Sequence, residues 1–210
     1  MQIYSVNRAP SAIAVDGRLD DEAWKNAPWT NDFVRSLDAL GTRQRTRARL
    51  LHDDTTLFVG FEVEDDFVVT PFHQNDEPLY TSEVCEIFLQ PGGTGRPYFE
   101  IELSPNDLLF DASFTGRRQG MDIAWDSGAR HAVNMGPSAG ARIDRGWTGE
   151  LAIPFARLGV ARSLEHGETW RFNLYRLDAD RAGSTEGLAY SAPLVGDFHN
   201  LDRFAFLRFE

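Results

Sequence analysis

The feature that most constrains this chain is a series of short runs in which apolar and polar residues alternate, each closed by a turn-forming cluster. Two such runs, 84–89 and 98–103, flank a segment rich in glycine and proline. A period of two residues places alternate side chains on opposite faces of an extended strand, and Gly and Pro favour the turns between strands. These two runs therefore predict a hairpin-like pair of strands.

The same pattern recurs along the whole chain. It predicts strands over residues 45–52, 57–63, 84–89, 98–103, 108–114, 130–135, 141–143, 147–153, 170–177 and 203–209. Helix signals are limited to residues 20–27, with acids in the first turn and a proline just beyond, and to one further turn at 154–158. The sequence therefore predicts an all-β single domain, residues 1–210: an antiparallel β-sandwich, jelly-roll or immunoglobulin-like, with one or two short helices.

Charge and cysteine content exclude several classes of function. The chain carries 32 acidic and 21 basic residues, a net charge of −11, so we expect neither nucleic acid nor an anionic membrane surface as a partner. Cys85 is the only cysteine, which excludes an internal disulfide and a thiolate metal cluster. The first residues lack the apolar core of a signal peptide. We expect a protein that acts in the cytoplasm or, if a leader has been removed, in the periplasm or outside the cell.

Four blocks of the sequence together resemble a known family. They are 15–24 (VDGRLDDEAW), 52–61 (HDDTTLFVGF), 82–89 (SEVCEIFL), and 147–154 (WTGELAIP) continued by 170–176 (WRFNLYR) and 203–209 (RFAFLRF). In this order and spacing they resemble carbohydrate-binding module family 9, within the wider set of DOMON-like β-sandwich domains. The resemblance implies a β-sandwich that binds sugars in a surface cleft, often with structural calcium. It also implies a stand-alone module, because the chain has no room for a catalytic domain.

The resemblance assigns aromatic residues in two loops to a clamp around the sugar. One clamp ring of the family lies just before the third block, where this chain has Tyr80 in place of the family's tryptophan. The second ring lies in the loop before the last strand, where Phe198 or His199 takes its place. Aromatic faces suit the C–H faces of a sugar ring. In the alternative interpretation, Tyr80 and Phe198 are loop residues packed on the rim of the sandwich.

Acidic residues on two neighbouring predicted strands are further candidates. Glu86 matches the family position whose carboxylate bonds sugar hydroxyls, and a buried acid in an apolar strand is costly unless it is paired or faces a cleft. Glu100, which replaces a family arginine, shares one strand face with Glu102. If the two strands pair, the three acids form a cluster whose pKa values rise unless a cation intervenes. The alternatives are a salt bridge from Glu86 to Arg176 and a solvated acidic face for the second strand.

The strand predicted at 170–177 adds two candidates. Tyr175 matches a family position that presents a polar side chain to the sugar. Arg176 points to the opposite face and offers a planar donor fork that suits vicinal hydroxyls, or else it pairs with Asp178 or Asp180. The predicted ligand-binding residues are therefore Tyr80, Glu86, Glu100, Tyr175, Arg176, Phe198 and His199.

Tryptophan residues divide into two groups. Trp24, Trp147 and Trp170 lie among apolar neighbours and are interpreted as packing residues. Trp125 lies in a loop rich in Gly and Asp and is the candidate for an exposed ring outside the family match.

These features favour non-catalytic binding of a mono- or oligosaccharide. One alternative is a glycoside-active enzyme that uses Glu86 with Glu100 or Glu102, since such enzymes place two carboxylates about 5–10 Å apart. Another is a DOMON-like domain that holds haem through Met121 or Met135 with a histidine or Lys25. A third is a sandwich that binds a protein partner through a flat apolar patch.

No cofactor is assigned from the residues themselves. Structural calcium is implied by the family, and calcium requires oxygen ligands. The acidic segments that offer them are 53–54, 64–66 and 106–107.

Overall fold

The computed structural model describes residues 2–136 and 145–210, and within them the chain is almost entirely strand and loop. The strands are β1 (Ile3–Arg8), β2 (Val34–Arg35), β3 (Thr46–His52), β4 (Thr56–Glu64), β5 (Val84–Gln90), β6 (Tyr98–Leu103), β7 (Leu109–Phe114), β8 (Arg130–Met135), β9 (Gly146–Pro154), β10 (Thr169–Ala179), β11 (Thr185–Ala189) and β12 (Ala205–Phe209). Four short 3-10 turns are η1 (Glu22–Asn26), η2 (Leu79–Thr81), η3 (Phe155–Leu158) and η4 (Leu201–Arg203).

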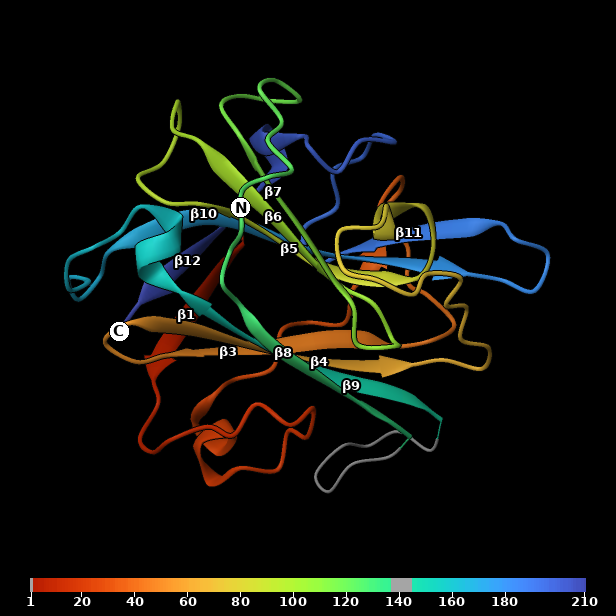
Figure 1. Ribbon diagram of the computed structural model, residues 1–210, viewed down its shortest axis with the longest axis horizontal. Coiled ribbons are helices and arrows are strands. Elements are labelled where there is room, and N and C mark those ends of the chain that lie inside the picture. The colour runs from red at the N-terminus through yellow and green to blue at the C-terminus, as the bar shows by residue number, and fades with distance from the viewer. Residues whose placement is uncertain (1, 137–144) are drawn as a thin grey trace.

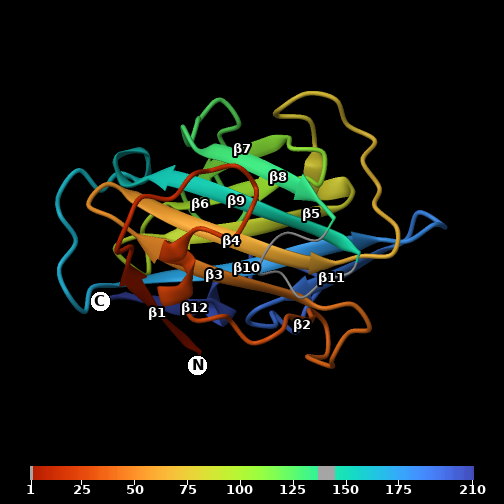
Figure 2. The same ribbon diagram turned by 90° about the horizontal axis from the view of Figure 1, so that it is seen from below.

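The strands form two packed layers (Figures 1 and 2). One layer has the order β7-β6-β5-β10-β12, and the other has the order β3-β4-β9-β8. Strand β1 joins them, because its first four residues pair in parallel with β12 and its last two residues pair in parallel with β3. The predicted β-sandwich is confirmed, and the other pairings between these strands are antiparallel.

The inner faces of the two layers enclose the main apolar core. Leu50 and Val59 from one layer and Ile87 and Leu174 from the other are fully buried there. Because side chains alternate along a strand, the residues next to Ile87 and Leu174 must project from the outer face of their layer. Glu86 and Tyr175 are therefore placed outside the main core.

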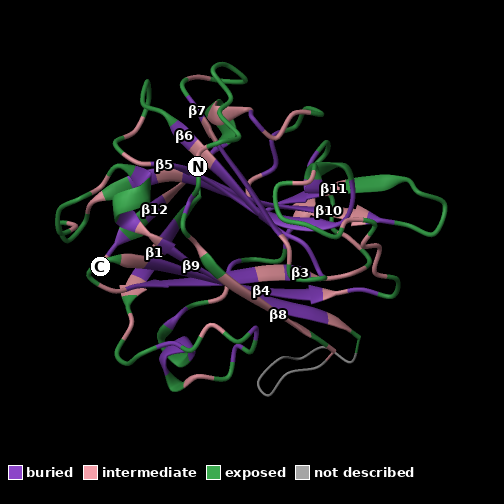
Figure 3. Ribbon diagram, viewed as in Figure 1, coloured by how far each residue is buried: buried purple, intermediate pink, exposed green. Residues whose placement is uncertain are grey.

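The outer face of the β7-β6-β5-β10 layer carries a second apolar cluster that includes Phe88, Tyr98 and Phe110. Leu79 of η2 and the partly buried Phe198 pack on this face from loops. Strand β5 is consequently buried along its whole length, on both faces (Figure 3). An acid on such a strand lies beneath loops rather than in open solvent.

The strands predicted from the alternating pattern are present with small shifts at their ends, apart from residues 141–143, which lie outside the described residues. Strands β1, β2 and β11 were not predicted, since these runs are short or carry few apolar residues. The expected helical segments are the 3-10 turns η1 and η3. In the described part of the chain, no helix is long and apolar enough to cross a membrane.

The three tryptophans interpreted as packing residues are buried, with exposed fractions of 1% for Trp24, 0% for Trp147 and 1% for Trp170. Trp125 is partly buried and packs against Phe99, with 4.7 Å between ring centroids.

Candidate functional site

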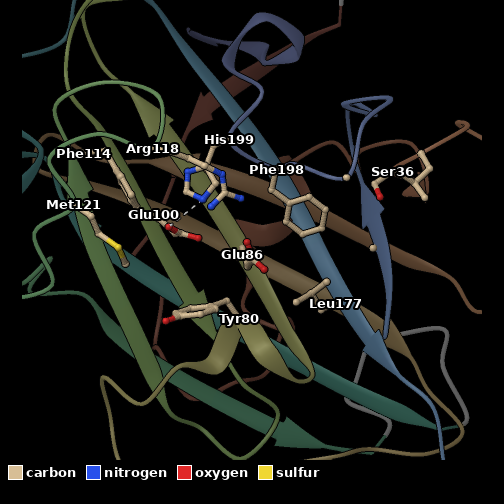
Figure 4. Close-up of a pocket in the computed structure, with 13 residues that line it drawn as sticks. Ser36, Tyr80, Glu86, Glu100, Phe114, Arg118, Met121, Leu177, Phe198 and His199 are labelled. Carbon is tan, nitrogen blue, oxygen red and sulfur yellow. Dashed lines mark ion pairs between the residues drawn. The ribbon is translucent and has the colours of Figure 1, made fainter. Parts of the chain in front are cut away.

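A pocket of about 510 Å³ opens on the outer face of the β7-β6-β5-β10 layer. It brings together five of the residues predicted to bind a ligand: Tyr80, Glu86, Glu100, Phe198 and His199. They come from η2, from β5, from β6 and from the loop before η4 (Figure 4). Tyr175 and Arg176 do not line it.

Two aromatic rings stand on either side of Glu86 in this pocket (Figure 4). Tyr80 is 43% exposed and meets Phe110 edge-on, with 5.2 Å between ring centroids. Phe198 stacks on Tyr175 with ring centroids 4.1 Å apart and planes within 6°. The Tyr175 hydroxyl donates a 2.7 Å hydrogen bond to the Phe198 carbonyl. Tyr175 thus supports the Phe198 ring, which forms one wall of the pocket. The buried Tyr175 hydroxyl is engaged by the Phe198 carbonyl and is not free to bond a ligand.

Three carboxyl groups form the cluster at the pocket floor. Glu86 on β5 lies directly opposite Glu102 on β6, and Glu100 lies two residues from Glu102 on the same face. Each offers a carboxylate oxygen within 4.8 Å of the others. Glu86 and Glu100 line the pocket, and Glu102 lies behind them, fully buried.

Two of the floor carboxyls have oxygens without a hydrogen-bond partner. Glu86 Oε1 and both Glu102 carboxyl oxygens are buried without a hydrogen bond of ordinary geometry, although the Tyr80 backbone amide and the Glu100 carboxyl lie near enough to Glu102 to influence its pKa. Burial and the neighbouring carboxyls raise the pKa of Glu86 and of Glu102 well above the usual range. Burial raises the pKa of Glu100 to about 7. Carboxyls held close together in a dry site retain protons for this reason.

His199 borders the floor as a neutral side chain. Its Nδ1 is 2.8 Å from the Tyr98 hydroxyl, and its Nε2 is 3.9 Å from Glu100 Oε2. Burial, with a contribution from Arg118, lowers the pKa of His199 to about 4. The Tyr98 hydroxyl also accepts from the Arg118 backbone amide. When this hydroxyl donates to Nδ1, the proton of the neutral His199 ring lies on Nε2, the nitrogen nearer Glu100.

Arg118 is a lining residue that the sequence reasoning missed. Its guanidinium and that of Arg117 both donate to Asp197, at 2.9 Å and 2.8 Å. These bonds tie the loop after β7 to the loop before η4 across the rim of the pocket. Arginine pairs that join residues about 80 positions apart leave no local pattern in a sequence. Phe114, Met121, Ser36, Leu37, Leu177, Gly187 and Gly196 complete the lining.

Arg176 lies on the opposite face of β10, at the edge of the space between the two layers. It is fully buried, and its Nη2 is 3.0 Å from Asp65, 3.2 Å from Glu83 and 3.0 Å from Asp178. The predicted alternative, an ion pair with Asp178, is therefore present. The other predicted alternative, a salt bridge from Glu86 to Arg176, is not among these contacts. Burial and nearby Asp65 raise the pKa of Glu83 to about 8 despite the guanidinium.

Arg176 decides whether the carboxylates around it can bind the calcium that the family implies. Asp65, Glu83 and Asp178 offer oxygens at a spacing that a metal ion could bridge. The Arg176 guanidinium already contacts all three carboxylates. A divalent cation does not fit among these carboxylates while Arg176 is there, because two cations would compete for the same oxygens.

The other acidic segments weighed for calcium are engaged in surface contacts. Asp54 pairs with Arg8 at 2.7 Å, and Asp107 lies 2.8 Å from Nδ1 of His131.

The side chains weighed for haem are dispersed. Met121 lines the pocket, Met135 is exposed at the end of β8, and Lys25 pairs with Glu22 on η1 at 2.6 Å.

Comparison with known proteins identifies the family. The sequence model for carbohydrate family 9 binding domain-like proteins matches residues 15–208. The chain belongs to this family. The match spans nearly the whole chain, from the loop before η1 to β12, so the family 9 fold accounts for both layers of the sandwich.

Solved structures share this family 9 fold at low sequence identity. A putative carbohydrate-binding protein from Bacteroides uniformis superposes with a TM-score of 0.81 at 16% identity, covering 100% of this chain and 99% of that one. A family 9 module from Caldicellulosiruptor kristjanssonii in complex with cellotriose has a TM-score of 0.73 at 17% identity, covering 100% and 94%. The same kind of module in complex with glucose has a TM-score of 0.71 at 17% identity, covering 98% and 95%. No curated protein sequence matches the chain.

Proposed function

We propose that this protein binds carbohydrate without catalysis, and that the sugar lies in the pocket between Tyr80 and Phe198. The observation that carries the proposal is the placement of these two aromatic side chains, from separate loops, on either side of a carboxyl floor (Figure 4). Family membership and the fold shared with modules in complex with glucose and cellotriose support the same conclusion.

The chemistry of the pocket suits a sugar ring. Aromatic faces cover C–H surface, while fixed polar groups at the floor accept and donate hydrogen bonds. Glu86 and Glu100 supply acceptors and, when protonated, donors. His199 adds a donor through Nε2. The volume of about 510 Å³ is within the range of small-molecule sites and accommodates one or two sugar residues.

The glycosidase alternative receives less support from the same residues. A glycosidase uses one protonated and one ionised carboxyl on opposite sides of the bond to be broken. Glu86 and Glu100 lie on adjacent strands of one floor, and the pKa values of both are raised. Two carboxyls on the same floor do not lie on opposite sides of a glycosidic bond, which is the arrangement that hydrolysis requires.

The proposal is tested by measuring the affinity of the protein and two variants for a panel of mono- and oligosaccharides by calorimetry. Tyr80→Ala and Phe198→Ala each remove one wall, and since a stacking contact contributes on the order of 1 kcal/mol, each should weaken binding by roughly fivefold. Phe67→Ala is the matched control, because Phe67 is 38% exposed and lies outside the pocket. Equal effects of all three substitutions, or binding unchanged by both wall variants, would remove the pocket from the proposal.

A further inference from the structure

The floor of the pocket holds three carboxyl groups whose oxygens lie within 4.8 Å of one another, and two of them, Glu86 and Glu100, line the ligand space. Arg118 is the one arginine or lysine lining the pocket among the described residues, and it is bound to Asp197, which it shares with Arg117. His199 is neutral, with its pKa lowered to about 4, and its Nε2 is 3.9 Å from Glu100. Glu86 and Glu100 therefore line the ligand space with one guanidinium nearby, that of Arg118, which is already engaged by Asp197.

A carboxyl group that lines this space has a buried oxygen without a hydrogen-bond partner. Glu86 is 1% exposed, lines the pocket, and has an Oε1 atom without a hydrogen-bond donor. Buried carboxylate oxygens are normally satisfied, so an orphan oxygen at the base of a ligand pocket points to a donor that the ligand brings. A donor that also carries positive charge would satisfy Glu86 and compensate the neighbouring acids.

The spacing of the acids is compatible with a primary ammonium group. A primary ammonium group has three N–H donors, and acceptors about 2.8 Å from the nitrogen at tetrahedral angles lie about 4.6 Å apart. The oxygens of the glutamate cluster all lie within 4.8 Å of one another. The walls of the pocket are the rings of Tyr80 and Phe198, whose faces attract an organic cation as well as C–H groups.

We propose that the preferred ligand is an amino sugar with a free, protonated amino group, held by Glu86 and Glu100 with Glu102 behind them. This inference rests on the proposed function, since it names the sugar class for the same pocket. A neutral sugar would leave these carboxyls in their protonated form, whereas an ammonium group beside them would stabilise the ionised form. A divalent metal would use the oxygens but would gain nothing from the aromatic walls, because it prefers six to eight oxygen ligands.

The test uses three sugars that differ at a single position: glucosamine, glucose and N-acetylglucosamine. Each is titrated into the full-length protein by calorimetry at neutral pH and near-physiological salt. Glucosamine should bind about tenfold more tightly than the other two, because hydrogen bonds to a charged group are the stronger ones. Glu100→Gln and Glu86→Gln should each bring the ratio of glucosamine affinity to glucose affinity close to one, whatever the substitution does to the affinity for glucose itself. Glu186→Gln, a change of the same charge at an exposed site outside the pocket, should retain the preference for glucosamine.

The outcomes separate this inference from the proposed function. Glucose bound as tightly as glucosamine, or a preference that survives both pocket variants, would overturn the amino-sugar inference and leave carbohydrate binding intact. If neither these three sugars nor any member of the mono- and oligosaccharide panel binds, both the amino-sugar inference and the proposed carbohydrate binding are overturned. Calcium is titrated as a separate ligand. If calcium binds the wild type but not Glu86→Gln, and if glucose binding requires calcium, then the acids hold a metal ion and the amino-sugar inference is wrong.

Discussion

Arg176 shows how much a single residue contributes when its charge is fully enclosed. Its guanidinium also donates to Thr46 Oγ1 and to the Glu64 carbonyl, so one side chain connects β10 to β3 and β4. Removing one partner of a buried ion cluster leaves the remaining charges uncompensated, which costs more than the intact cluster contributes.

We expect Arg176→Ala to lower the free energy of unfolding by about 3–5 kcal/mol, because Asp65, Glu83 and Asp178 would be left without their cation. Urea unfolding followed by fluorescence measures this loss. Arg35→Ala is the control, since Arg35 forms exposed pairs with Asp38 and Glu186 and should cost no more than about 1 kcal/mol. Similar losses for the two variants would contradict the structural role assigned to Arg176.

At the scale of the secondary-structure element, packing against β11 determines the position of the Phe198 ring. Gly187 of β11 faces the Phe198 ring and Ser36, and it lines the pocket. A Cβ at Gly187 would lie 2.8 Å from Ser36 Oγ and 3.0 Å from two Phe198 ring atoms. A strand that carried a side chain here would push the ring away from its stacked position on Tyr175.

We therefore expect Gly187→Ala to weaken sugar binding by about three- to tenfold while destabilising the fold by only about 1 kcal/mol, since the displaced atoms belong to a side chain that can move. Calorimetry and thermal melting measure the two effects. Gly41→Ala is the matched control, because no heavy atom lies within 4 Å of a Cβ built there. Unchanged affinity in Gly187→Ala would mean that the Phe198 ring is not held by β11.

At the scale of the whole molecule, buried acids couple stability to pH. Burial raises the pKa of Glu100 from 4.5 to about 7. Between these values the folded protein holds a proton that the unfolded chain has released. The stability associated with Glu100 is therefore complete below about pH 4.5 and is lost as pH rises through about 7.

His199, which lines the pocket with Glu86, Glu100 and Arg118, acts in the opposite sense. Its pKa is lowered from 6.5 to about 4, so it adds stability as pH rises between these values. Above about pH 6.5 the acids alone determine the trend, and the melting temperature of the protein should fall toward pH 8.

The Glu100→Gln variant isolates the contribution of Glu100. Because glutamine does not titrate, the variant should gain about 2–3 kcal/mol relative to wild type between pH 5 and pH 8, roughly 4–10 °C in melting temperature. Differential scanning calorimetry across this range measures the difference. A difference that stays constant with pH, or that favours wild type as pH rises, would show that Glu100 is ionised in the folded protein.

Much of the fold follows from the sequence alone, because alternation with a period of two is a local property. It predicted most of the strands, and it placed Glu86 with Val84 on one strand face and Arg176 opposite Tyr175. The resemblance of the four blocks led to the family and to the two loops that carry Tyr80 and Phe198.

Only the tertiary structure decided what each of these side chains meets. The register of β5 against β6 brought Glu86 opposite Glu102, and packing of the layers enclosed Arg176 among three acids. Docking of the loops stacked Phe198 on Tyr175 and added Arg118 to the pocket. Local sequence determines the direction of a side chain along its own strand, whereas burial and pairing depend on segments far apart in the chain, which come together only when the whole domain folds.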